Sequence, residues 1–177
     1  MHFERLSSTA HPMYDTALYR ASFPPQEQRE PASQEQIMRD DEYHFNPIWD
    51  GDAFIGLMLC RETADFVYVE HFCILPAMRN RRYGQRALSL LAQQGKTVIL
   101  EIDPPVDSIF ILRKGFYARC GFAENPFPHV HPPYHRENHG HALVIMSLTG
   151  PLSQGTYDAF LLYLDSRVMD GVFACAP

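Results

Sequence analysis

The sequence predicts an α/β protein with a mixed, mostly antiparallel sheet, one parallel pair of strands and flanking helices. Three observations lead to this prediction. Apolar segments separated by short polar turns follow one another from residue 43 to residue 75, a pattern typical of an antiparallel meander. A helical period then begins at Gly84 and ends near Gly95. The β-branched segment Thr97–Ile102 follows, so its strand should run parallel to the strand before the helix.

The N-terminal part predicts one strand and two short helices ahead of the meander. Phe3–Leu6 has the composition of a first strand. Pro12 stands where a first helical turn would start, and Pro24-Pro25 ends that helix. Ser33, followed three residues later by Gln36, is typical of a capping box and predicts the start of a second helix.

The meander itself consists of three predicted strands, Tyr43–Trp49, Ala53–Cys60 and Phe66–Leu75. A turn at Asp50-Gly51 joins the first two, since this dipeptide is a strong hairpin signal. A second polar turn, Arg61 to Asp65, joins the last two. Each strand should therefore pair with the next in antiparallel fashion.

Beyond the parallel pair, the pattern predicts a helix capped by Asp107 or Ser108. Its periodicity predicts an inward face made of Ile109, Leu112, Phe116 and Cys120. A Pro- and His-rich loop, Asn125–His141, then leads to a strand at Leu143–Leu148. The last predicted element is an amphipathic C-terminal helix at about 153–170.

Composition limits the class of protein and its partners. A chain of 177 residues is long enough for one domain, which we expect to span 1–177. The net charge of −6 disfavours nucleic acid and anionic membrane as partners. The four cysteines lie far apart without a CxxC pair, which favours reduced thiols in a cytoplasmic protein. The start of the chain lacks a signal-peptide core, and the apolar run Ala53–Cys60 is shorter than the ~20 residues of a membrane helix.

The segment "RNRRYGQRAL", Arg79–Leu88, predicts an anion site. It places Arg79, Arg81, Arg82 and Arg86 at the start of a helix, in an acidic protein. Helix N-termini already carry partial positive charge, so arginines there are unfavourable unless an anion binds in front of them. The spot is small, which favours a small anion over a long polyanion. The alternative is a solvated basic helix start without a ligand.

The order of elements, with two motifs, resembles the GNAT superfamily of acyl-CoA-dependent N-acyltransferases from about Phe54 to Met146. The first motif, "ILPAMRNRRYG", matches the family signature of Arg or Gln, two residues, Gly, one residue, then Gly or Ala. Here Arg82 stands where the first glycine is usual. The second motif, "FYARCGF", looks like the family's late helix with its catalytic tyrosine. Phe110 replaces an asparagine that this helix often carries.

The resemblance implies acetyl-CoA as co-substrate and direct transfer of its acetyl group to a primary amine. A backbone N–H in the strand segment Phe72, Cys73 and Ile74 would bind the thioester carbonyl. Tyr117 would be the general acid that protonates the departing thiolate. The pyrophosphate of coenzyme A would bind to the loop formed by Arg79, Asn80, Arg81, Arg82, Tyr83, Gly84 and Gln85.

Two carboxylates are candidates for the general base, because each interrupts an otherwise apolar strand. They are Glu70 and Glu101. A buried carboxylate usually has a partner or a function. Glu70 comes just before the thioester segment, which favours it as the base, and Glu101 is then expected on the acceptor side. Alternatively, either side chain points to solvent from a half-exposed strand face.

The loop "PFPHVHPPYHRENHGH" holds five of the nine histidines. Zinc is often bound by histidine, but the loop lacks the spacing and the Cys or carboxylate pattern of a zinc site, so we expect no metal. We expect the loop to line the acceptor site through His131, Tyr134 and His135. The acceptor would be a small-molecule or peptide amine.

A second function remains open at this stage. The chain could bind an acyl-CoA without transferring its acyl group, and the departures at Arg82 and Phe110 favour this alternative. Tyr117 and the strand carboxylates favour an enzyme. A homodimer is compatible with the sequence, whereas a P-loop nucleotide site is disfavoured because no GK[ST] follows the glycine.

Overall fold

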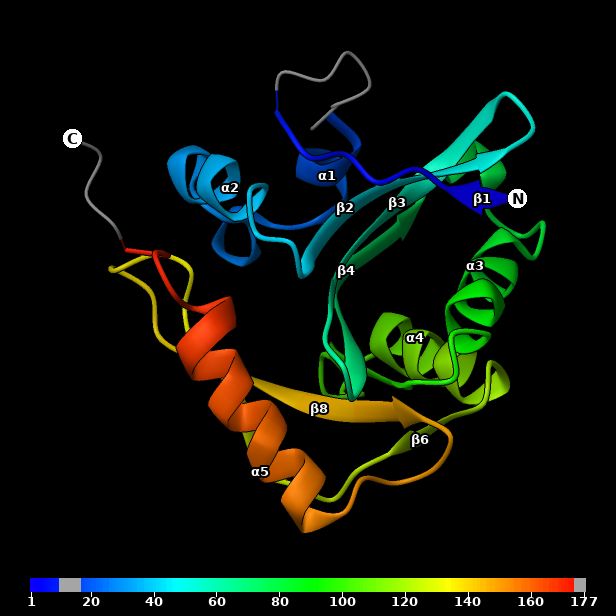
Figure 1. Ribbon diagram of the computed structural model, residues 1–177. Coiled ribbons are helices and arrows are strands. Elements are labelled where there is room, and N and C mark those ends of the chain that lie inside the picture. Colours follow the sequence, from blue (N-terminus) through cyan, green and yellow to red (C-terminus); the bar gives the residue numbers. More distant parts are fainter. Residues whose placement is uncertain (10–16, 174–177) are drawn as a thin grey trace. The chain divides into compact units, whose positions relative to one another are not determined.

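The computed structural model describes residues 1–9 and 17–173. These residues group into two compact units, which we describe one at a time (Figure 1). Unit 1 comprises Met1–Pro24 and Ile37–Leu100, and unit 2 comprises Pro25–Gln36 and Glu101–Pro177.

The strands of unit 1 form the predicted meander and the predicted parallel pair. They are β1 (His2–Phe3), β2 (Tyr43–Asp50), β3 (Ala53–Glu62), β4 (Phe66–Ile74) and the start of β5 (Thr97–Ile102). The first four pair in chain order, each antiparallel to the next. β5 then runs parallel to β4, with Phe66 beside Thr97 and Val69 beside Leu100. The predicted fold class is therefore confirmed.

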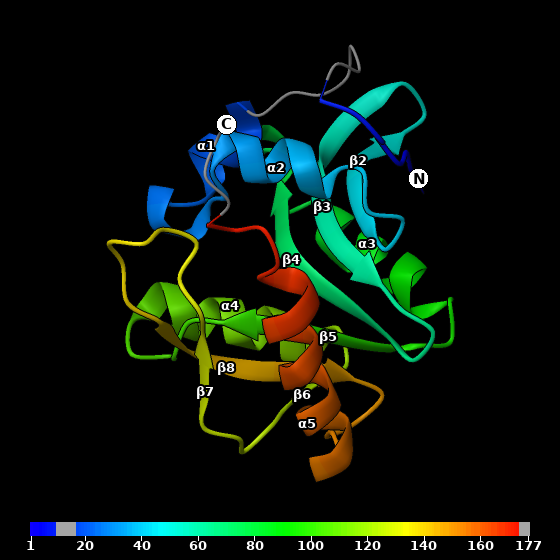
Figure 2. The ribbon, with the colours of Figure 1, turned by 60° about the vertical axis from the view of Figure 1, so that its left-hand side comes forward.

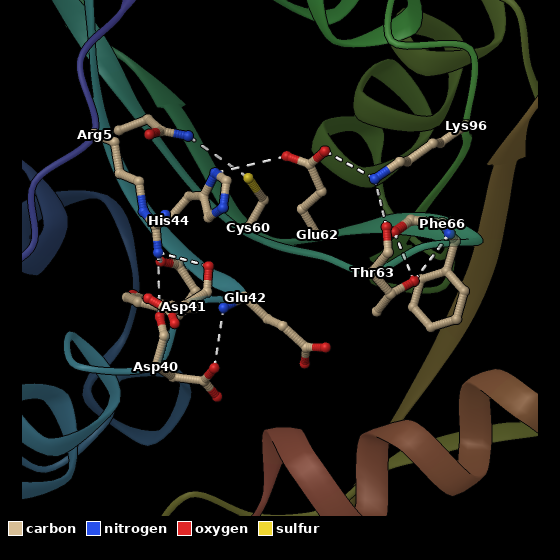
Figure 3. A network of polar contacts seen from close by, with 12 residues as sticks. Arg5, Asp40, Asp41, Glu42, His44, Cys60, Glu62, Thr63, Phe66 and Lys96 are labelled. Atoms are coloured by element: carbon tan, nitrogen blue, oxygen red, sulfur yellow. Dashed lines mark hydrogen bonds and ion pairs between the residues drawn. The ribbon is translucent and has the colours of Figure 1, made fainter.

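Lys96 fixes the beginning of the parallel pair. Its ammonium group donates to the Glu62 carboxylate at 2.8 Å and to the Thr63 carbonyl, both at the β3–β4 turn (Figure 3). The Thr63 hydroxyl accepts from the Phe66 N–H at 3.0 Å and closes this turn. Because Phe66 lies beside Thr97, these bonds align β5 with β4 at the first residue of each strand.

The helices of unit 1 are α1 (Ala17–Ser22) and α3 (Tyr83–Ala92), with a 3-10 turn, η2, at Pro76–Met78. Leu18 of α1 belongs to the buried cluster that also contains Phe45. Pro12, the predicted start of the first helix, lies outside the described residues. The predicted strand Phe3–Leu6 has different bounds in the structure. β1 covers only His2–Phe3, and Leu6 forms an isolated bridge to Phe45.

Unit 2 contains three strands and three helices in its described residues (Figure 2). β8 pairs antiparallel with both of the other strands. The predicted C-terminal helix corresponds to α5, which Ser153 caps, and to the π-helical turn that continues it. The elements are α2 (Pro31–Ile37), α4 (Ser108–Arg119), β6 (Phe122–Glu124), β7 (His129–His131), β8 (His141–Leu148), α5 (Gln154–Tyr163), its π-helical turn (Leu164–Val168) and the 3-10 turn η1 (Pro25–Glu27).

Two local predictions in unit 2 are wrong. Ser33 does not cap α2, because the helix already begins at Pro31. The predicted inward face of α4 is also incorrect: Ile109 is 65% and Leu112 68% exposed, whereas Tyr117 is buried. Four apolar residues are consecutive in "SIFILRKGFYAR", so the helical period does not select one face. Asp107 caps α4 as predicted.

Among the described residues, we find no helix that combines the length and the apolar composition required to cross a membrane.

Candidate functional site

A β-bulge in β4 separates its parallel-paired half from the predicted thioester segment. Leu59 of β3 faces His71, but the next residue, Cys60, faces Val69, so Glu70 is the extra residue. The parallel pairs with β5 run only to Val69 in unit 1. A bulge bends its strand and interrupts the ladder. The segment Phe72–Ile74 thus lies past this bend. It pairs with β3 and follows the residues that pair with β5 in unit 1.

Close backbone packing holds the thioester segment on β3. Gly56 lies opposite Ile74, and a Cβ atom added to Gly56 would stand 2.2 Å from the Cys73 carbonyl oxygen. Only glycine permits this approach. The side chain of Cys73 is no candidate nucleophile, since burial raises the pKa of its thiol. Its backbone is what the segment could offer to a ligand.

The thiols of the described part of the chain are free. Cys60 and Cys73 are buried and Cys120 is partly exposed. Burial, with smaller contributions from Glu62 and other charges, raises the pKa of Cys60 to about 12. Cys175 lies outside the described residues.

The arginine-rich loop between β4 and α3 has the geometry of an anion site. Asn80 and Arg82 have φ angles of 62° and 61°, in the left-handed region. Left-handed residues next to right-handed ones turn successive N–H groups towards one point, which can then bind an anion. Arg82 is also the N-cap of α3, and its side chain does not cap the helix. The helix N-terminus therefore presents open N–H groups, which favour anion binding.

The arginines of this loop differ in their contacts. Arg86 donates two hydrogen bonds to the Asp50 carboxylate, both of 3.1 Å. Hydrogen bonding from Arg86 is the main reason why the pKa of Asp50 is lowered. Arg79 donates to the Ile74 carbonyl at 3.2 Å and so ties the loop to the end of β4. Arg81 and Arg82 are exposed and form no ion pair within the described residues. These two carry the charge beside the open helix start.

Glu70 has a partner that the sequence did not predict. Its carboxylate accepts from the Arg61 Nε at 3.0 Å, and both side chains are only 1% exposed. Arg61 also reaches Asp40 at 3.0 Å. The guanidinium therefore holds the Glu70 carboxylate in a buried ion pair. The signal that we missed is Arg61 itself: we assigned it to a turn, but it lies within β3, which ends at Glu62.

Unit 2 brings three of the four predicted acceptor-side residues together. The Glu101 carboxylate is hydrogen-bonded through Oε1 to His129 Nε2, and its Oε2 lies 3.9 Å from His131 Nε2. The Tyr134 hydroxyl lies 3.4 Å from that same His131 nitrogen. The side chains of Glu101, His129 and His131 are 7%, 0% and 8% exposed. They form a buried acid–base cluster.

His129 is a residue that sequence reasoning missed. Its Nδ1 lies 3.1 Å from the Tyr157 hydroxyl, which comes from α5. A signal was present, because His129 and His131 are two residues apart in a strand and so point to the same side. The contribution of Tyr157 was not visible, since it arises from a separate helix.

His135 makes contacts separate from this cluster. Its Nδ1 bonds to the Glu30 carboxylate at 2.9 Å, and its Nε2 bonds to the carbonyls of Pro25 and Gln28 at 3.0 and 2.9 Å. Burial alone would lower the pKa of His135, but these bonds outweigh it and raise the pKa above 6.5. His135 thus joins the His-rich loop to the 25–30 segment.

Tyr117 lies in unit 2, on α4. Its ring makes edge contacts with Phe116 and Phe122, with centroids 5.2 and 5.7 Å apart. A buried ring with a polar end usually keeps its hydroxyl bonded to some group, so burial alone does not define its role.

One group of side chains in the described residues has the composition of a metal site. Ligand atoms of Glu27, Asp103 and His141 lie within 4.8 Å of one another. Burial, followed by the charge of Asp103, raises the pKa of Glu27. Arg113 already pairs with Asp103 at 2.8 Å, which opposes a cation there. The expectation that no metal binds therefore stays a prediction.

Comparison with known proteins is consistent with this geometry. The model of the Acetyltransferase (GNAT) family matches residues 12–122. A solved structure from Bacteroides thetaiotaomicron, assigned to the GNAT family, is 29% identical with a TM-score of 0.87, covering 95% of this chain and 98% of that one. No curated protein matches the chain.

Two more distant structures share the fold. The ribosomal-protein-S18-alanine N-acetyltransferase from Escherichia coli is 15% identical with a TM-score of 0.55, covering 86% of this chain and 95% of that one. An aminoglycoside 6'-N-acetyltransferase complexed with coenzyme A is 16% identical with a TM-score of 0.54, covering 83% and 96%.

Proposed function

Because this chain belongs to the GNAT family of acetyltransferases, we propose that it transfers the acetyl group of acetyl-CoA to a primary amine. The observation that carries the proposal is the loop in front of α3, where two left-handed residues and an uncapped helix start coincide with exposed arginines. This arrangement suits the pyrophosphate of coenzyme A.

The donor side is assigned to unit 1. Arg79–Gln85 binds the pyrophosphate, with Arg81 and Arg82 as the charged contacts. The backbone of Phe72–Ile74 binds the thioester, past the bulge at Glu70. A donor N–H aimed at the carbonyl oxygen stabilises the charge that develops there in the transition state.

The acid–base groups complete the proposed mechanism. An alkyl ammonium has a pKa of about 10.4, so the acceptor must lose a proton before it attacks. Glu70 was the favoured base from the sequence, but its pairing with Arg61 now favours Glu101 for this step. Tyr117 then protonates the leaving thiolate. The acceptor is a small-molecule or peptide amine, the two kinds of acceptor for which the N-acetyltransferases described above are named.

We further propose that residues 1–177 act as one transferase domain, in the cytoplasm, alone or as a homodimer. The free thiols of the described residues and the acidic composition support this proposal.

The alternative is an acyl-CoA-binding module without transferase activity. Arg82 in place of the usual glycine favours it, because the side chain restricts access to the backbone. Incubation with acetyl-CoA and a panel of amines separates the two functions. Release of free thiol that depends on an amine supports the enzyme, whereas binding of acetyl-CoA without release supports the module.

Binding of coenzyme A is tested separately by calorimetry. Arg81→Glu should weaken binding at least about tenfold, since one charge-assisted hydrogen bond contributes about 1.5–3 kcal/mol. The matched control is Arg119→Glu, the same charge change on an exposed position of α4. Equal affinities in both variants would exclude the loop as the pyrophosphate site.

A further inference from the structure

The four arginines around the start of α3 fall into two pairs. Arg79 and Arg86 donate hydrogen bonds to oxygen acceptors of the protein. Arg81 and Arg82 are exposed beside the open helix start. The first pair lies at the two ends of the loop, so its contacts fix the loop on both sides of the residues that face the solvent.

The acceptor at the helix end is Asp50, the last residue of β2. The two terminal nitrogens of Arg86 donate to its two carboxylate oxygens, each at 3.1 Å. Two parallel bonds of this kind fix the orientation of a guanidinium as well as its position. The same guanidinium lies 5.2 Å from the centroid of the Tyr83 ring, and the Met1 ammonium lies 3.4 Å from Asp50 Oδ1. Asp50 therefore connects the β2–β3 turn to the first turn of α3.

This pair lies at the surface, where the Asp50 and Arg86 side chains are 29% and 47% exposed. Surface ion pairs contribute measurably when the geometry is bidentate or when several charges form a network, and both conditions hold here. Hydrogen bonding from Arg86, with a smaller contribution from Tyr83, lowers the pKa of Asp50, so the carboxylate is ionised at neutral pH. The effect of the pair is therefore expected at the first turn of α3 rather than in the core.

The first turn of α3 depends on contacts from outside the helix. In α3, all of whose residues the structure describes, the first turn has no acidic residue, and the side chain of the N-cap Arg82 makes no capping bond. The Arg86 N–H donates to the Arg82 carbonyl at 3.0 Å and closes the turn. Helix ends fray when few contacts hold them. Arg86 thus closes the turn through its backbone, and its side chain fixes the turn to Asp50.

We propose that Asp50 is a positioning residue for coenzyme A, because its grip on Arg86 fixes the first turn of α3 and with it the N–H groups that meet the pyrophosphate. This inference rests on the proposed function. Asp50 acts through Arg86 and not by contact with the cofactor. The sign of its effect is diagnostic, since a carboxylate beside an anion site weakens anion binding by its charge alone. Neutralising Asp50 would then strengthen binding, whereas loss of a positioning residue weakens it.

Amide hydrogen exchange of the free protein tests the positioning without any ligand. In Asp50→Asn and in Arg86→Met, the Arg86 amide should exchange about three- to fivefold faster than in the wild type, the factor that a well-formed surface ion pair contributes. The control is Asp52→Asn, an exposed aspartate of the same turn, which should exchange as the wild type does. Equal rates in all four proteins would overturn the proposal.

Cofactor binding is the second test. The Kd for coenzyme A and the KM for acetyl-CoA should rise about three- to fivefold in Asp50→Asn and in Arg86→Met, with kcat unchanged. The double variant should be no weaker than either single variant, because both changes remove one interaction. A general loss of structure would lower kcat instead. Unchanged or tighter binding of coenzyme A by Asp50→Asn would refute the positioning role.

The inference and the proposed function fail in different ways. If the wild type binds no coenzyme A, the proposed function is wrong, and the exchange rates alone decide whether Asp50 fixes the first turn. If the wild type binds coenzyme A and Asp50→Asn binds it equally well or more tightly, the proposed function stands and the inference about Asp50 is wrong.

Discussion

Replacing Glu70 by glutamine should destabilise the protein strongly, whatever its effect on turnover. The change removes the negative charge of the carboxylate that lies 3.0 Å from Arg61 Nε, where both side chains are 1% exposed. The guanidinium is then left buried with part of its charge uncompensated. Removal of one partner of a buried ion pair costs about 3–5 kcal/mol.

The expected magnitude lies at the lower end of that range. Asp40 remains at 3.0 Å from Arg61 and is 25% exposed, so it retains part of the compensation. We therefore expect Glu70→Gln to lower the free energy of unfolding by about 3 kcal/mol. This is a large share of the roughly 5–15 kcal/mol that stabilises a typical domain.

Urea unfolding of four proteins measures the effect. The wild type, Glu70→Gln, Arg61→Met and the double variant form a cycle that isolates the coupling between the two side chains. The control is Glu62→Gln, which breaks the half-exposed pair with Lys96 and should cost no more than about 1 kcal/mol. A loss below 1 kcal/mol in Glu70→Gln, equal to that of the control, would refute the reasoning.

Three further predictions concern single positions. Gly56→Ala should lower both stability and acetyl-CoA affinity, because its Cβ would stand 2.2 Å from the Cys73 carbonyl; unchanged values in urea unfolding and calorimetry would contradict this. His135→Gln should destabilise the protein most at low pH. The folded pKa of His135 is raised above 6.5, so its contribution is complete below that value and is lost as pH rises through the folded pKa; a pH-independent difference in unfolding free energy would count against this. Tyr117→Phe should reduce kcat by about 10²- to 10⁴-fold with coenzyme A affinity unchanged, and full turnover would exclude Tyr117 as the acid.

The sequence predicts the parallel strand pair well, because local patterns determine it. The change of period at Gly84, the stop at Gly95 and the β-branched run Thr97–Ile102 leave few alternatives. The anion site at the arginine loop stays a prediction, which rests on four arginines at a helix start in an acidic chain. The left-handed angles of Asn80 and Arg82 then follow from the turn that the loop makes.

The acid–base groups were less predictable, because their partners come from distant parts of the chain. Glu70 and Asp40 both form ion pairs with Arg61, although they are 30 residues apart in sequence. His129 and Tyr157 are 28 residues apart and lie on a strand and a helix. Hydrophobic periodicity gives the face of each element but not which polar groups meet across elements, and one bulge changes that register.

The left-handed angles of Asn80 and Arg82 also bear on how quickly a ligand can bind. A residue with a side chain costs about 1–2 kcal/mol in this conformation, whereas glycine costs little. The surrounding fold therefore imposes the shape of the loop at folding, before any ligand arrives. Conformational entropy that a flexible glycine loop would lose on binding has already been lost here. Such preorganisation favours association without a slow rearrangement, and Arg82→Gly should give a more stable protein that binds coenzyme A more slowly.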